Sequence, residues 1–350
     1  MTTMISGLGL LLLTLAGFSF FSMKFPKGRQ AMSGMADAAI ASFLVEAVHK
    51  YILGDLMGSA FFQVLGSTAG SLGGVAAAIL VPLHMGVNPV LAVVAGLAVG
   101  GYGILPGFLA GYVIGLVAPI VEKKLPEGLN IILGALAMAP LARIIALGVD
   151  PVVTAAMAQI GTTITAAAEQ SPLVMGFLLG GIMKMICTSP LSSMALTAML
   201  GLTGLPMGIA AIACVGGSFA NGIVFHRLGF GDRSNVIAVM LEPLTQAEII
   251  TAHPVPIYTG TFVGGGLSGI AAAAFGIINN APGTASPIPG LLAPFAFNDP
   301  VKVVMAIGCA VVAGCVGGWI VSSVFKRLPS FKGISMPRLQ QEETPVSESV

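Results

Sequence analysis

Long stretches without a charged residue constrain this chain more than any other feature. Between Tyr51 and Ile120 the only Asp, Glu, Lys or Arg is Asp55, between Ser171 and Phe225 it is Lys184, and Pro254–Asn298 has none. Charged residues make up 8% of the 350 residues, against about 25% in soluble domains. So few charges cannot cover a soluble surface, so we expect most of the chain to lie in lipid. This excludes a disordered protein, a nucleic-acid binder and a cytosolic enzyme.

Apolar segments of membrane-spanning length recur along the chain. A span needs about 20 apolar residues, and about 30 residues per span and loop gives about ten crossings. We therefore expect an all-α polytopic membrane protein with about ten transmembrane helices. The clear candidates are residues 5–23, 59–83, 89–121 (one long span or two short ones), 129–149, 203–225, 257–278 and 302–325. Whether 37–56, 151–170, 172–200 and 234–252 cross is left open; the first is either an interfacial helix or a span with a polar inner face.

The two ends of the chain predict its orientation. Residues 1–28 have the pattern of a signal-anchor helix, with an apolar run followed by Lys24, Lys27 and Arg29. Basic flanks stay in the cytoplasm, so we expect the N-terminus outside. Lys326 and Arg327 place the C-terminus in the cytoplasm by the same rule. Residues 329–350 are polar and predict a disordered cytoplasmic tail.

Two apolar segments are interrupted in a way that regular spans are not. Residues 183–200 contain a Thr-Ser-Pro break, and residues 279–296 contain four prolines and no charge. Proline removes a backbone donor, so such a segment cannot face lipid as a regular helix. We expect both segments to be re-entrant hairpins that line a polar cavity, as broken helices do in transporters. An external loop packed under other helices is the alternative.

Glycines recur at every fourth position in several predicted spans. Gly103, Gly107, Gly111 and Gly115 form the longest such row. Small residues at this spacing let helices approach closely. The simplest interpretation is packing within one subunit, and a dimer face is the alternative.

Motifs of soluble enzymes are absent, so the candidate site consists of polar groups in apolar surroundings. The cysteines lie in apolar runs and the four histidines are scattered, so we expect neither a metal site nor a cofactor. Neutral donors gather at the two interrupted segments, which suits a neutral polyhydroxylated ligand better than an ion. The candidate substrate-binding residues are Thr188, Ser189, Ser192, Ser193, Asn221, Glu242, His253, Asn279, Asn280, Thr284 and Ser286.

Four of the polar groups have open alternatives. Glu242 and His253 could bind a sugar and manage a hydroxyl proton, or cap helices at the water interface. Asn221 either faces the cavity or bonds a neighbouring helix. Lys184 either attracts an anionic group near the first hairpin or extends its ammonium to water.

The sequence resembles a known family at these same segments. The block Thr188–Leu205, the stretch Asn279–Thr284 and the segment Ser286–Phe295 are similar to the EIIC-type membrane proteins of the phosphotransferase system, in the branch also described as perfringolysin toxin-regulator proteins. The similarity implies a transport domain over residues 29–328, a homodimer, a bacterial inner-membrane location and a sugar-sized site. It implies separate IIA and IIB proteins as partners, because the chain contains no such domain, and phosphorylation would require them.

We therefore expect a carrier of a small polar solute, a sugar or sugar derivative, working by alternating access around a re-entrant hairpin site. A membrane regulator or sensor acting through a partner protein is one alternative. A non-phosphorylating anion or ion transporter is the other, although rings of like charge or a repeated filter are not visible in the sequence.

Overall fold

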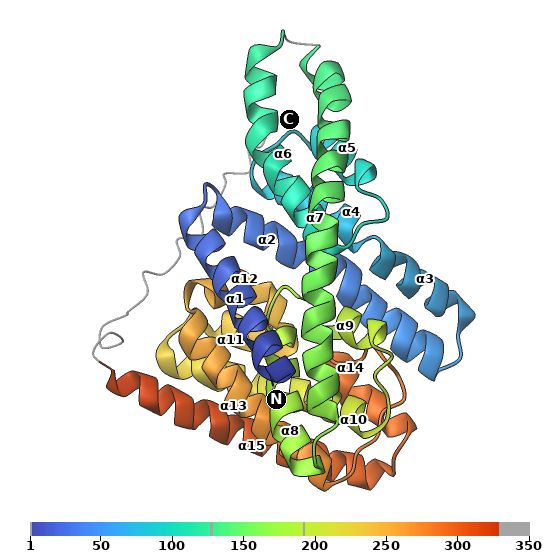
Figure 1. Cartoon of the computed structure of the whole chain (residues 1–350), viewed down its shortest axis with the longest axis vertical. Coiled ribbons are helices and arrows are strands. Elements are labelled where there is room, and N and C mark those ends of the chain that lie inside the picture. The colour runs from blue at the N-terminus through green and yellow to red at the C-terminus, as the bar shows by residue number, and fades with distance from the viewer. Residues whose placement is uncertain (1, 127–128, 192, 329–350) are drawn as a thin grey trace, which may run out of the picture.

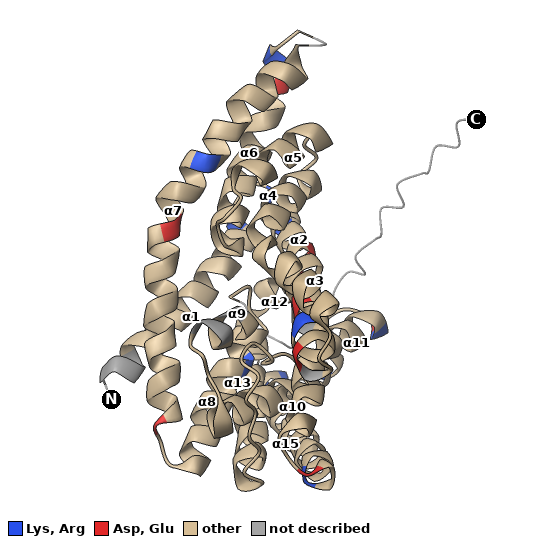
Figure 2. Ribbon diagram, turned by 90° about the vertical axis from the view of Figure 1, so that its right-hand side faces the viewer, with Lys and Arg blue, Asp and Glu red and all other residues tan. Residues whose placement is uncertain are grey.

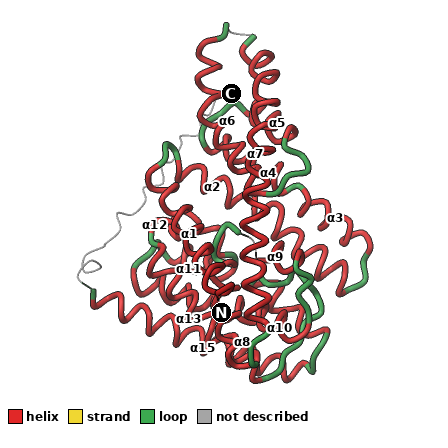
Figure 3. Tube along the Cα trace, in the orientation of Figure 1, coloured by secondary structure: helices red, strands yellow, loops and turns green. Residues whose placement is uncertain are grey.

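Every regular element that the structure describes is a helix (Figure 3). The computed structural model describes residues 2–126, 129–191 and 193–328. The all-α fold class expected from the sequence is confirmed. A helix pairs its backbone N–H and C=O groups within itself, which an apolar chain in lipid requires. The tail predicted for residues 329–350 lies outside the described residues.

The chain begins with a long α-helix, followed by a second helix that starts as an α-helix and continues as a π-helix. α1 (Thr2–Lys24) is followed by α2 (Gly28–Ala39), which continues into the π-helical stretches η1 (Ile40–Leu44) and η2 (Ala47–Leu56). The segment 37–56 therefore extends α2 instead of forming a separate interfacial helix. Two of its charges pair within the segment, since Lys50 Nζ donates to Glu46 Oε1 at 3.0 Å, while Asp37 pairs with His84 and Asp55 accepts from Gln63.

A second group of helices packs against α2 and the π-helical stretches that continue it. α3 (Ala60–Ser71) and α4 (Gly73–His84) meet at a bend of 52°. The predicted segment 89–121 is two helices, α5 (Pro89–Ala98) and α6 (Ile104–Lys124). α4 packs against both of them and against α2. The glycine row of α6 lies in this packing, because Gly107 faces Gly74 and Gly111 faces Ala78 on α4. These contacts fit packing within one subunit.

α7 (Asn130–Ala168) runs from the top of the molecule down to the level of the C-terminal bundle (Figure 1). Its 39 residues join two segments that the sequence separated. At 1.5 Å per residue it is about 58 Å long, whereas the hydrocarbon core is about 30 Å thick. The helix must therefore tilt or project beyond the core. Arg143 on α7 donates to the carbonyl oxygens of Ala98 and Gly100, at 3.2 and 2.8 Å.

The C-terminal half is a tight bundle of four long helices. They are α8 (Pro172–Cys187), α10 (Gly204–Leu228), α13 (Pro254–Ala274) and α15 (Pro300–Arg327). Glycines let their backbones touch: a Cβ on Gly180 would lie 2.7 Å from the Gly265 carbonyl oxygen, and one on Gly314 would lie 2.6 Å from the Gly216 carbonyl carbon. Small residues between membrane helices allow this close approach of their backbones.

Short elements connect the long helices and place the candidate site. They are α9 (Ser193–Met199), α11 (Arg233–Leu241), η3 (Pro243–Gln246), α12 (Ala247–Ala252), α14 (Pro287–Leu292) and η4 (Ala293–Ala296). Each lies beside a proline or glycine, which ends helices.

Among the described residues, six helices are long and apolar enough to cross a membrane, or seven if α3 and α4 form one bent span. The expected count of ten is not reached, because proline and glycine divide several apolar segments. Residues 89–98, 172–187 and 287–296 form apolar helices of only 10–17 residues. Charged residues are sparse along the ribbon and lie mainly at helix ends and at a few points along η2 and α7 (Figure 2).

Candidate functional site

The first interrupted segment turns back between α8 and α9. Pro190 lacks a backbone N–H, and Ser189 Oγ donates to the Ile186 carbonyl oxygen at 2.8 Å, which closes the end of α8. Thr188 and Ser189 are fully buried. Ser192, a predicted site residue, lies outside the described residues.

Three helices meet at this turn through hydrogen-bonded side chains. Asn221 on α10 donates to Thr188 Oγ1 at 3.1 Å, and Thr261 on α13 donates to Asn221 Oδ1 at 2.8 Å. All three side chains are buried. Asn221 therefore bonds its neighbouring helices, and a buried amide satisfied in this way fixes the position of the turn.

The second interrupted segment is an ordered turn from Asn279 to Ser286. Asn279 Oδ1 accepts from the Ala281 N–H at 2.9 Å, and its Nδ2 donates to Thr284 Oγ1 at 2.8 Å. Gly283 has a φ of 86°, where a side chain would be strained. Asn280 lies at the start of the turn, where its Oδ1 accepts from the Gly204 N–H at 3.1 Å. Asn279 and Thr284 thus shape the turn.

The two turns contact each other directly. Ser193 Oγ at the start of α9 donates to the Ala285 carbonyl oxygen at 2.5 Å. The Gly283 N–H donates to Thr197 Oγ1 at 3.2 Å. The predicted hydroxyls of both segments therefore lie in one cluster, although 92 residues separate Ser193 from Ala285.

A third turn completes the cluster. It begins at Glu242, between α11 and η3, where Glu242 Oε1 accepts from the Leu244 N–H at 3.4 Å. Ser286 Oγ donates to Glu242 Oε2 at 3.5 Å. The Glu242 side chain is buried, and none of the described Lys, Arg or His side chains forms an ion pair with it. The Glu242 carboxyl group therefore has hydrogen-bonding capacity to spare beside Ser286.

The described contacts of His253 lie elsewhere. It is the residue before α13, and its ring stacks on Phe230 with centroids 4.4 Å apart. Burial lowers the pKa of the His253 imidazole below its ordinary value, and the nearby Arg29 lowers it further. The structure thus places His253 beside a basic helix end and does not bring it into contact with Glu242.

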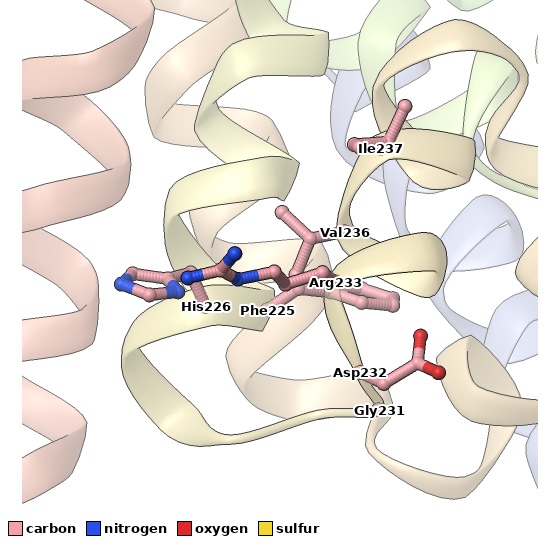
Figure 4. A pocket seen from close by; sticks show the side chains of 7 residues that line it. All are labelled: Phe225, His226, Gly231, Asp232, Arg233, Val236 and Ile237. Atoms are coloured by element: carbon pink, nitrogen blue, oxygen red, sulfur yellow. The ribbon is translucent and has the colours of Figure 1, made fainter.

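The basic loop between α10 and α11 forms a separate pocket of about 370 Å³ (Figure 4). Its Arg233 and His226 side chains reach toward the same side of the pocket in this view, and Asp232 points away from them. Gly229 and Gly231 have positive φ values of 76° and 74° and make the turn between the two helices. Asp232 caps α11, accepting from the Asn235 N–H at 3.0 Å.

Comparison with known families identifies the chain. The sequence model of the family described as "Phosphotransferase system, EIIC" matches residues 29–336. The chain belongs to this family. The resemblance drawn from the Thr188–Leu205 block is confirmed, and the chain is a multi-pass membrane protein of the sugar-permease type. No curated protein matches the chain at a significant level.

Two parts of this EIIC chain's cluster did not follow from the sequence. One is the contact between Glu242 and Ser286, which requires knowing that the segment 234–252 turns back. The other is Tyr51, whose ring lies against Gly283 of the second turn. Tyr51 is buried beside the charged pair of η2. A tyrosine in an apolar run gives no signal of that contact.

Proposed function

We propose that this EIIC protein moves a small polar solute, a sugar or sugar derivative, across the bacterial inner membrane. The observation that supports this best is the meeting of three broken-helix turns around Glu242, Ser193 and Ser286. Each turn brings hydrogen-bonding groups into an apolar bundle, where polar groups are costly without a partner. A sugar offers many hydroxyls to such groups and needs no net charge.

The contacts favour a re-entrant arrangement of the first two turns. α8 starts beside the end of α13, since Gly176 faces Gly269, and α10 starts beside Asn280. Both ends of the α8–α9 segment therefore lie at one end of the bundle, and its turn lies one helix length away. The second turn also begins beside Gly204 and reaches Ser193 at Ala285.

The third turn enters from the opposite side. α11 starts after the basic end of α10, and α12 ends beside α1, where Thr251 donates to Ser22 Oγ at 3.0 Å. Glu242 lies at the tip of this segment. Turns from both sides of the membrane thus meet at one level, which suits a solute site that opens alternately to each side. A count of ten regular crossings is therefore too simple for this topology.

The cluster is closed in this state. Glu242, Ser193 and Ser286 have exposed fractions of 8%, 3% and 2%. A solute can enter only if the turns separate. We expect the Glu242 carboxylate to accept one solute hydroxyl, while the serine hydroxyls and the Asn279 and Thr284 side chains hold the turn's shape.

Partners follow from the family. The EIIC domain implies a solute and separate IIA and IIB proteins. If a IIB protein phosphorylates the bound sugar, it does so from the cytoplasmic side, and Glu242 lies on the segment that enters from that side. We also propose a homodimer, with the N-terminus outside and the C-terminus in the cytoplasm.

A ligand screen on the purified protein tests the proposal. Sugars, sugar alcohols and sugar acids are added in detergent, and a ligand at a hundredfold excess over its Kd stabilises the fold by about 2.7 kcal/mol. We expect at least one member to raise the melting temperature and to show saturable uptake into proteoliposomes without IIB. If no member binds or is taken up, the proposal fails and a regulator acting through a partner is favoured.

A further inference from the structure

Lys184 is the most unusual charged residue in the bundle. It lies on α8, four residues before the first turn, and its side chain is fully buried. It does not extend its ammonium to water, which is the usual solution for lysine in an apolar helix. The ammonium points to the region between α8 and α10, since Nζ donates to Ser218 Oγ at 2.7 Å.

The bundle makes room for this lysine on two other helices. A Cβ on Gly217 of α10 would lie 2.5 Å from Lys184 Cγ, and a Cβ on Gly265 of α13 would lie 3.0 Å from the same atom. Any larger residue at either position would have to displace the lysine stem. The four-carbon stem is therefore enclosed by glycine on both sides, and the ammonium has a fixed position.

None of the described carboxylates pairs with the ammonium. Its described contacts are the neutral Ser218 hydroxyl and the Cys187 thiol, the latter at 3.9 Å. Among residues 2–126, 129–191 and 193–328, no carboxylate lies within 4.0 Å of Lys184 Nζ. Glu242 makes no ion pair with it. A charged group inside a membrane protein usually has a partner or a function.

The first turn connects this lysine to the polar groups around Glu242. Cys187, which Lys184 contacts, ends α8, and Ser193 begins α9 on the other side of the turn. Ser193 bonds the backbone of Ala285, and the next residue, Ser286, donates to Glu242. Lys184 and Glu242 thus mark the two ends of the cluster in which the three turns meet.

We propose that the solute is a sugar acid, whose carboxylate binds Lys184 while its hydroxyls bind at the Glu242 end. This rests on the proposed transport function and narrows its substrate class. Lysine serves as a point charge for an anion. The two ends of the cluster differ in chemistry, with an ammonium at one and hydrogen-bonding carboxyl and hydroxyl groups at the other, and this difference sets the solute's orientation.

Matched pairs of neutral sugars and their acids test this in the full-length protein. The probes are D-glucose with D-glucuronate and D-gluconate, and D-galactose with D-galacturonate, measured by thermal shift and calorimetry. We expect an acid to bind at least tenfold more tightly than its neutral parent. Lys184→Met, which keeps an unbranched stem, should lose at least tenfold in affinity for that acid. Lys302→Met, which removes a lysine at the start of α15, should not.

The outcomes separate this inference from the transport function. If a neutral parent binds the wild-type protein as tightly as its acid, the inference is overturned while sugar binding stands. If the acid binds Lys184→Met as tightly as wild type, the lysine is structural and the inference is also overturned. If the protein binds neither class, the transport function itself fails. The comparison of each acid with its neutral parent in the wild-type protein tests the inference even if Lys184→Met does not fold.

Discussion

At the scale of single residues, Glu242 is the side chain on which the candidate site most depends. Replacing it with Gln keeps the shape but puts an amide NH2 where one carboxyl oxygen stands, so one hydrogen bond of the site is lost. A buried polar group left without its partner costs about 1–3 kcal/mol, so we expect solute affinity to fall about fivefold to a hundredfold. The measurement is the Kd of the screened ligand together with the melting temperature of the empty protein.

Glu248→Gln is the matched control for that prediction. Glu248 lies on α12 near Glu242, but its side chain is partly exposed and pairs loosely with Arg29 at 3.9 Å. Exposed pairs of this kind contribute little, so affinity should stay within about twofold of wild type. Equal loss in both variants would mean that charge on this segment, and not the Glu242 position, determines binding.

Asn221 is predicted to act on stability. Its amide links Thr188 on the first turn to Thr261 on α13. Asn221→Ala removes the donor to the buried Thr188 Oγ1, while Thr261 keeps its bond to the Ile257 carbonyl oxygen. A buried polar group that loses its partner costs about 1–3 kcal/mol. We expect a lower melting temperature for Asn221→Ala, measured in detergent by intrinsic fluorescence.

A double-mutant cycle with Thr261→Val separates the bond from the packing. The two changes should be clearly non-additive, because each removes the same hydrogen bond. Thr162→Val, at an exposed position on α7, serves as the control. Strict additivity of the Asn221 and Thr261 changes would contradict the role assigned to the amide.

At the scale of elements, the structure predicts that replacing two different glycines of α15 with alanine will change the melting temperature differently. A Cβ on Gly314 would lie 2.6 Å from the backbone of α10, whereas one on Gly308 would have no neighbour within 4 Å. Overpacking costs about 1–3 kcal/mol. Gly314→Ala should therefore lower the melting temperature, and Gly308→Ala should leave it unchanged or raise it slightly. Equal effects at both positions would show that α15 does not pack against α10 in this register.

The sequence predicted the elements unevenly, for physical reasons. The length of the apolar segments predicts α1, α10 and α15. The Thr188–Pro190 break predicts the first turn, because proline and hydroxyl side chains affect the backbone locally. The sequence does not predict the turn at Glu242, since a short apolar run beside a charge fits either a span or an interfacial helix. The contacts of Ser193 with Ala285 and of Tyr51 with Gly283 depend on tertiary packing, which no local pattern reports.

At the scale of the whole molecule, the proposed orientation can be tested by labelling. The basic residues at the ends of α1, α10 and α15 favour one cytoplasmic side. The α2–η2 helix starts beside that side and ends at Leu56, so Met57 should lie outside. In a cysteine-free background, a membrane-impermeant maleimide on intact cells should label Met57→Cys but not Gln30→Cys. The reverse pattern would invert the topology, and with it the side from which Glu242 enters.

The most direct test of the central claim is a structure of the protein in lipid nanodiscs with the best ligand of the screen bound. We predict that the ligand lies among the three turns, with a hydroxyl at Glu242, and that the Ser193 to Ala285 contact opens to admit it. A ligand bound elsewhere, for example in the pocket of about 520 Å³ beside Lys50 and Asn280, with the three turns still in contact, would contradict the account.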